Sequence, residues 1–205
     1  MTTNKPKGQH FVPNNSYLAE FTDPNTPTNY EPYVWVFQKG SRRGKNKAPS
    51  NILKETDLYT LQLRTGEKNY SIEETLSSIE GKFATIFRTK IKHHLPLNEK
   101  DHIYLCAFVS TMLQRTLRHR DNLNNFVDQL IEHAESAELQ YNIEPGESNR
   151  LKEYKKNIFQ RGIIQTLPDT TKLLLNMGLA FLCAERGAKF ITSDDPCNLF
   201  NSDLQ

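Results

Sequence analysis

The sequence predicts an α+β fold that is mainly α-helical. Apolar residues recur at helical spacing through the middle of the chain, two short segments before it have the composition of strands, and two apolar runs follow it. We therefore expect a helical bundle with an N-terminal β-hairpin and a short C-terminal hairpin, joined in one small sheet. With 205 residues, the chain fits a single domain over 9–197, with tails at 1–8 and 198–205.

The N-terminal hairpin is predicted from two strand-like segments. Residues 33–37 are aromatic or β-branched throughout, and residues 57–63 alternate well enough to be the partner strand. Between them, residues 39–47 contain five cations and two glycines, which is typical of an exposed loop. A solvated loop explains these charges more simply than contact with nucleic acid, because no aromatic residue is interleaved among them.

Three helices are expected in the middle of the chain. Ser71 and Glu74 form a potential capping box, followed by apolar residues at helical spacing as far as the break at 93–96. Asn98 is a good N-cap for a second helix, with Asp101 at its third position. That helix is apolar at nine of the eleven residues 103–113 and can run on through residue 131. A Pro-Gly loop at 145–146 precedes a third helix over about 149–166.

The last part of the chain favours a short helix and two strands. Asp169 or Thr170 can cap a helix that reaches Met177. Residues 179–184 and 189–193 are apolar segments that flank a glycine turn, so we expect a hairpin there. The alternative is one helix from 170 to 186.

The composition limits the compartment and the class of protein. The N-terminus lacks the apolar core of a signal peptide, and the longest apolar run, 173–183, is too short to span a membrane. Three widely spaced cysteines predict neither disulfides nor a zinc ribbon, so we expect a cytoplasmic protein. The sequence also lacks the phosphate-binding, dinucleotide-binding, zincin and α/β-hydrolase motifs.

The net charge of +2 is the sum of two halves of opposite sign. Residues 1–120 hold 18 Lys and Arg against 11 Asp and Glu, whereas residues 121–205 hold 8 against 13. A basic half of this kind is compatible with a phosphate-bearing ligand.

Two candidate site residues lie in the basic half of the chain. His10 sits in the first apolar cluster and could be a metal ligand, a general base or a structural histidine. Helical geometry from Ile72 places Glu80 at about 80°, on the edge of the apolar stripe, where a carboxylate must be paired or metal-bound. Glu73, at about 100°, is a less favoured substitute.

Arg115 and the 193–196 turn complete the set of polar candidates. Arg115 follows the buried run and should point inward, as a clamp for phosphate or as part of a buried ion pair with Glu80 or Asp194. His119, one turn later, could extend either arrangement. The Ser-Asp-Asp-Pro turn offers Asp194 and Asp195 at the end of an apolar approach, although Asp-rich turns are common without chemistry.

Several segments resemble one protein family in order and spacing. They include Gln-His-Phe-Val-Pro at 9–13, Asn51, Tyr59 and Thr-Ser-Asp-Asp-Pro at 192–196. The chain is similar to a large bacterial and phage family catalogued as a domain of unknown function, over roughly 9–197. Its recurring polar positions match His10, Glu80, Arg115 and Asp194, and the resemblance adds Asn51 as a candidate for substrate binding beside Arg115.

These residues support two hypotheses about function. In the first, His10, Glu80 and Asp194 hold Mg²⁺ or Mn²⁺, and His10, Glu80 and Arg115 catalyse hydrolysis of a phosphodiester, as in a nuclease. Nucleic acid or another phosphate-bearing ligand would be the substrate. In the second, the protein is a non-catalytic binding or interaction protein, and the same residues form a buried polar network that fixes the N-terminal segment.

Overall fold

Helices dominate the computed structural model, which describes residues 8–63, 65–185 and 189–199. Within these ranges the α-helices are α1 (Ser71–Thr89), α2 (Glu99–Gln114), α3 (Leu117–Gln140), α4 (Glu147–Lys155) and α5 (Ile158–Leu175). Short 3-10 helices are η1 (Leu18–Phe21), η2 (Pro49–Asn51) and η3 (Ile91–His93). The expected α+β class with mainly helical content is confirmed.

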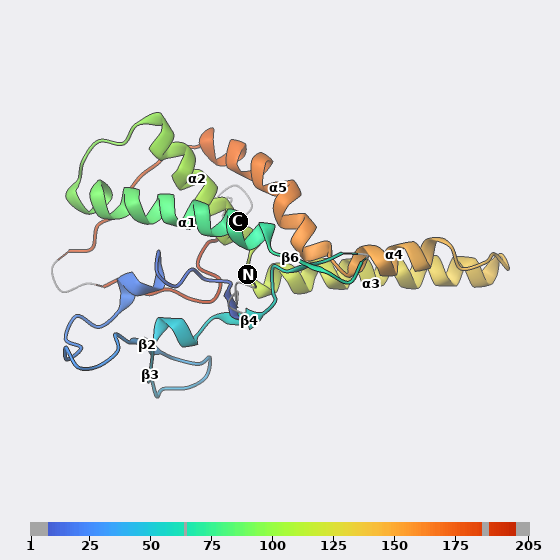
Figure 1. Cartoon of the computed structure of the whole chain (residues 1–205), viewed down its shortest axis with the longest axis horizontal. Coiled ribbons are helices and arrows are strands. Elements are labelled where there is room, and N and C mark those ends of the chain that lie inside the picture. Colours follow the sequence, from blue (N-terminus) through green and yellow to red (C-terminus); the bar gives the residue numbers. More distant parts are fainter. Residues whose placement is uncertain (1–7, 64, 186–188, 200–205) are drawn as a thin grey trace.

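The helices form a body and a projecting arm (Figure 1). In the body, α2 packs between α1 and α5. The arm consists of α3 and α4, which lie side by side and extend away from the body. A small apolar cluster of Val127, Ile131 and Ile158, with Leu151 against it, joins the base of the arm to α5. The arm is therefore built on its own small core.

The strands are short and belong to three separate antiparallel pairs. β1 (Gly8–His10) pairs with β4 (Lys54–Thr56), β2 (Val34–Val36) pairs with β3 (Lys45–Lys47), and β5 (Leu61–Gln62) pairs with β6 (Lys68–Asn69). The expectation of one small sheet is therefore wrong. All three pairs lie in the segment before α1 and close loops of that segment on itself.

The predicted pairing of residues 33–37 with 57–63 is also wrong. Residues 34–36 pair with 45–47, inside the basic segment expected to be a loop. Residues 57–63 cannot form one strand, because Asp57 has a positive φ of 55° and accepts a turn bond from the Thr60 N–H at 3.1 Å. The turn carries Leu58 and Tyr59 into the core. The alternation of 57–63 therefore reflects a buried turn.

The start of α1 and the end of α2 differ from the expected boundaries because other side chains cap the helices there. α1 begins at Ser71 itself, whose N–H is capped by Asn69 Oδ1 at 2.9 Å, so the Ser71–Glu74 capping box does not form. The second helix ends at Gln114, and Thr116 caps α3 by accepting from the His119 N–H at 3.2 Å. The capping box of Asn98 and Asp101 is confirmed, with both bonds present.

The helices after the arm are divided by Asn157. Its side chain exchanges two 3.0 Å hydrogen bonds with the backbone of Gln62 in β5, which fixes the break between α4 and α5. The expected helix over 149–166 is therefore two helices. α5 then continues through Pro168 to Leu175, where a separate short helix was expected.

The expected C-terminal hairpin is absent from the described residues. Residues 179–185 and 189–193 contain no strand, and the helix that was the alternative ends at Leu175, well short of 186. Part of the expected glycine turn, 186–188, and most of the expected tails lie outside the described residues. Residues 179–182 are exposed and form no strand, although their apolar composition predicts one.

The main core lies where the N-terminal segment meets the helical body. It joins residues from the first turns, the 57–60 turn, α1, α2 and α5: Phe11, Val12, Leu18, Leu58, Tyr59, Ile72, Leu76, Phe108, Met112, Phe159 and Ile163. In the described part of the chain, no helix combines the length and the hydropathy that a membrane span needs.

Candidate functional site

Arg115 lies at the junction of α2 and α3, where the helix break turns it into the core. The residue is 2% exposed. Its Nη1 donates to Glu80 Oε1 at 2.5 Å, its Nε donates to the Tyr59 hydroxyl at 3.2 Å, and its Nη2 donates to the backbone oxygen of His10. One guanidinium thus joins α1, the 57–60 turn and β1. The inward orientation expected from the helical phase is present.

Tyr59 is a further neighbour of Arg115 that is not among the predicted site residues. The guanidinium carbon lies 5.3 Å from the centre of its ring, and the hydroxyl lies 3.3 Å from the backbone oxygen of His10. Burial raises the pKa of Tyr59 to about 12, so its hydroxyl stays protonated at neutral pH. The signal for Tyr59 was present only in the family resemblance, because a tyrosine in an alternating segment otherwise predicts a strand.

The α1 helix brings two carboxylates to Arg115. Glu80 accepts from Arg115 and from the Ser16 hydroxyl, at 3.5 Å, and its side chain is 22% exposed. Glu73 lies two turns earlier on the same helical face and is half-buried. Burial raises the pKa of Glu73, Arg115 lowers it, and Glu80 raises it further. Glu80 is thus the carboxylate that pairs with Arg115, while Glu73 acts on the guanidinium only through its charge, and together the two carboxylates outweigh it when both are ionised.

His10 brings an imidazole to the same cluster from β1. Its Nε2 is buried and has no hydrogen-bond partner among the described residues. Burial lowers the pKa of His10, and Lys54 lowers it further, whereas the backbone at Pro49 and Ser50 and the charge of Glu80 raise it. The net direction keeps the imidazole neutral at pH 7, the form that binds metals and accepts protons.

The partners of Arg115 keep its guanidinium charged despite its burial. Desolvation acts against the cation, but Tyr59 and Glu80 outweigh it and raise the pKa of Arg115 above its ordinary value. Arg115 is therefore a permanent positive charge inside the core. A buried charge needs partners in well-formed geometry, which the three acceptors supply.

The structure does not join Asp194 to this cluster. Asp194 is exposed and makes no hydrogen bond or ion pair with any described residue. Its neighbour Asp195 lies 3.5 Å from Arg118, and the turn closes on itself through Ser193. Tyr17 and Thr192 hold the segment to the body at 3.0 Å.

The remaining candidates lie apart from the Arg115 contacts. Asn51 is exposed at the end of η2, and its N–H bonds only to Ala48 O, at 2.9 Å. His119 is half-buried on α3, where burial lowers its pKa. No three His, Cys, Asp or Glu side chains of residues 8–63, 65–185 and 189–199 are grouped as a metal site. The structure thus brings together His10, Glu80 and Arg115, with Glu73 and Tyr59.

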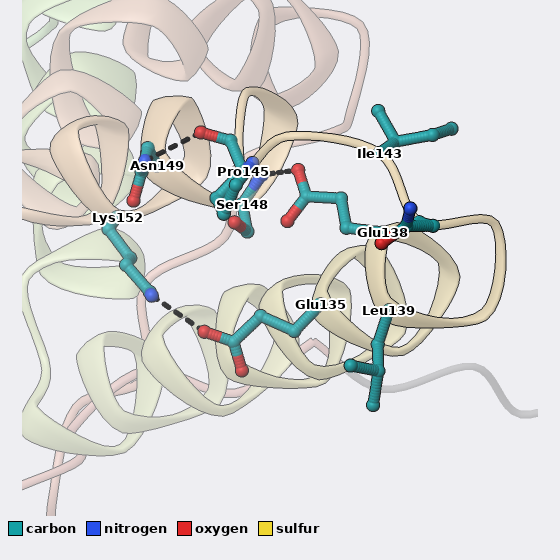
Figure 2. A pocket seen from close by; sticks show the side chains of 9 residues that line it. Glu135, Glu138, Leu139, Ile143, Pro145, Ser148, Asn149 and Lys152 are labelled. Carbon is teal, nitrogen blue, oxygen red and sulfur yellow. Dashed lines mark hydrogen bonds and ion pairs between the residues drawn. The ribbon is translucent and has the colours of Figure 1, made fainter.

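Hollows on the described surface include one on the arm and one near His10. One of about 440 Å³ lies at the far end of the arm and is lined by Glu135, Glu138 and Ser148 among others (Figure 2). Glu138 is committed there to structure, since its Oε1 accepts from three backbone N–H groups at the start of α4, at 2.9–3.0 Å. The other hollow, of about 290 Å³, includes Pro49 and Ser50, whose backbone contacts His10.

Comparison with known proteins places the chain in a family. No curated protein and no solved structure matches it. A family model described as protein of unknown function, DUF4238, matches residues 8–205 and so covers nearly the whole chain. The chain belongs to the DUF4238 family of proteins of unknown function.

Proposed function

We propose that the cluster of His10, Glu80 and Arg115 binds a divalent cation and hydrolyses a phosphodiester. The observation that carries this proposal is the buried Nε2 of His10, which has no partner in the described part of the chain, in a place where the charge of Glu80 acts on the imidazole. A buried polar atom without a partner costs free energy, and native structures retain such atoms chiefly where a ligand or water completes them.

The charge balance of the cluster favours a cation over a free anion. Glu73 and Glu80 carry two negative charges when ionised, and Arg115 supplies one positive charge inside the cluster, since Lys54, whose charge acts on His10, is exposed to solvent. A lone phosphate would meet this excess negative charge unfavourably, whereas a divalent cation would reverse it. Imidazole and carboxylate are suitable ligands for Mn²⁺, and Mg²⁺ commonly uses one or two carboxylates with water and substrate phosphate.

The residues of the chain would hold the reacting groups in place. A bound Mg²⁺ or Mn²⁺ supplies Lewis acidity toward a phosphate oxygen and activates water. His10 Nε2 and Glu80 are its proposed ligands, and Asp194 would complete the set only by leaving its exposed turn. Hydrolysis adds water across one P–O bond and yields a phosphomonoester and a hydroxyl group. With its three nitrogens bonded within the chain, Arg115 is proposed to position Glu80 and His10.

Cation binding is the first test of this proposal. Titration calorimetry with Mn²⁺ should show one site in the wild type, no site in His10→Gln, and an unchanged site in His133→Gln, which alters an exposed histidine on α3. At 100 times its dissociation constant, Mn²⁺ should stabilise the wild type by about 2.7 kcal/mol. Equal binding by the wild type and His10→Gln would overturn the proposed site.

Hydrolysis is the second test. The wild type with Mn²⁺ should release nitrophenol from bis(p-nitrophenyl) phosphate, and Glu80→Gln should lose that activity while it remains folded by circular dichroism. Binding of Mn²⁺ without turnover of this ester or of oligonucleotides would reject the hydrolase and leave a cation site.

A non-catalytic role is the second candidate, and the saturation of Arg115 favours it. Every nitrogen of this side chain already has a partner in the chain, as expected of a network that fixes β1 and the 57–60 turn on the helices. In that case His10→Ala should lower the melting temperature, and neither Mn²⁺ binding nor hydrolysis should be measurable.

A further inference from the structure

The hairpin of β2 and β3 carries a dense positive charge. Its loop and second strand contain Lys39, Arg42, Arg43, Lys45 and Lys47, all of them exposed. The sequence has no acidic residue between Glu31 and Glu55. None of the five cations forms an ion pair with a described residue. The charge of this hairpin is therefore free to act on a ligand.

Two large aromatic side chains are exposed on the same hairpin. Trp35 is 55% exposed and Phe37 is 62% exposed. Trp35 lies in β2 and Phe37 directly follows it, and both rings approach the same residue, Gly44, so they lie on the same face. Both rest on Gly44 of the opposite segment, where an added Cβ would lie 2.7 Å from the Phe37 ring and 3.1 Å from the Trp35 ring. The glycine thus leaves room for a flat aromatic surface.

The pairing register fixes where the cations stand relative to the rings. Trp35 lies opposite Asn46, while Lys45 and Lys47 lie opposite Val36 and Val34. Val34 is buried, which fixes the side of the hairpin that faces the body, and Tyr33 packs edge-on against Trp35 at 6.1 Å. A shift of one residue would exchange the two faces. The register therefore keeps the aromatic face open and places Lys45 and Lys47 on the opposite face with Val34 and Val36, so the cations nearest the rings are those of the loop.

We propose that the β2–β3 hairpin binds single-stranded nucleic acid. Bases would stack on Trp35 and Phe37, and the loop cations Lys39, Arg42 and Arg43 would contact phosphates. Exposed aromatic rings combined with free cations are the two components of single-strand recognition, because an unpaired base offers a free face for stacking. In a duplex the base faces are already stacked on each other and are not available to the rings. An acidic protein partner would account for the cations but not for the two exposed aromatic rings.

The position of the hairpin connects this surface with the candidate site. β3 leads directly into η2, and the backbone at Pro49 and Ser50 contacts His10. A single-stranded nucleic acid bound to the hairpin would therefore lie close to the cluster of His10 and Glu80. Only this last link rests on the proposed function, since binding to the hairpin requires no hydrolysis.

Trp35 makes the proposal directly measurable, because it is the single tryptophan of the chain. Its fluorescence should be quenched when a single-stranded oligonucleotide of about 12 residues is added to the full protein without metal. The matching duplex should bind more weakly. With three phosphate contacts, the slope of log K against log salt should be about −2.1.

Substitutions separate the two components. Phe37→Ala should weaken binding about 5- to 100-fold, which corresponds to the loss of one stacked base. Its control is Phe126→Ala, an exposed aromatic residue on α3 that should bind as the wild type does. The double variant Arg42→Ala, Arg43→Ala should reduce the salt slope by about 1.4. Its control, Arg150→Ala with Lys152→Ala on α4, should leave the slope unchanged.

The outcomes distinguish this proposal from its rivals and from the hydrolase. His10→Gln should still bind the oligonucleotide, so lost hydrolysis with intact quenching leaves the hairpin proposal standing. An absence of quenching would overturn it, as would equal affinity for duplex with no effect of Phe37→Ala. Binding to anionic vesicles without binding to oligonucleotides would assign the surface to membranes, and concentration-dependent self-association through the hairpin would assign it to a second copy.

Discussion

Replacement of Arg115 by methionine tests how burial sets the strength of an ion pair. Arg115 Nη1 and Glu80 Oε1 lie 2.5 Å apart, and their side chains are 3% and 22% exposed. Loss of one partner of a buried pair costs about 3–5 kcal/mol. Because Glu80 keeps some contact with solvent, we expect the lower end, about 3 kcal/mol, for Arg115→Met. A double-mutant cycle with Glu80→Gln should give a coupling energy of about 2 kcal/mol.

The matched control is the pair of Lys155 and Asp128. These atoms also lie 2.5 Å apart, but their side chains are 34% and 47% exposed. The cycle of Lys155→Met with Asp128→Asn should therefore give only about 0.5 kcal/mol. Urea unfolding followed by far-ultraviolet circular dichroism measures all the variants. Equal coupling energies in the two cycles would refute the reasoning that burial, at equal distance, makes the Arg115 pair strong.

Three further predictions concern stability. Between pH 5.5 and 7.5 the free energy of unfolding should rise with pH, because burial lowers the pKa values of His10 and His119 below the ordinary 6.5 and the unfolded chain then binds more protons. His10→Gln should reduce that rise in urea titrations and leave the part due to His119, whereas an unchanged slope would contradict the reasoning. Asn98→Ala removes an N-cap bond of α2 and should cost about 1 kcal/mol in thermal unfolding; no loss would show that the cap is replaceable. Met112→Ala in the core should cost about 2–5 kcal/mol, whereas Leu139→Ala at the exposed end of the arm should change stability by less than about 0.5 kcal/mol in the same urea assay.

Helical phase predicted the inner part of the site well. Glu80 was expected at the edge of an apolar stripe and Arg115 was expected to point inward; the Glu80 side chain is 22% exposed and the Arg115 side chain is 3% exposed. This works because a regular helix repeats its geometry, so sequence spacing converts directly into direction. Helical phase could not decide whether Arg115 is a phosphate clamp or part of an ion pair, because that depends on which side chain of a neighbouring helix faces it.

The pairing of strands and the contacts between remote loops could not be predicted from the sequence. The alternation at 57–63 resembles a strand, but a positive φ at Asp57 turns it into a buried corner that delivers Tyr59 to Arg115. The basic segment 39–47 resembles a loop, yet part of it pairs with β2. In both cases the outcome depends on contacts between distant residues, which local propensity does not contain.

The sequence by itself determined the class of the fold, the capping of α2, the apolar stripes and the split of charge between the two halves. Each of these follows from residues close together in the chain. Only the tertiary structure decided that Arg115 is enclosed by Tyr59, Glu80 and the backbone of His10, that Asp194 stays outside this cluster in the described chain, and that Trp35 and Phe37 lie across from the basic segment. The physical reason is that burial and pairing between remote segments fix these positions, and their cost or gain exists only once the chain has folded.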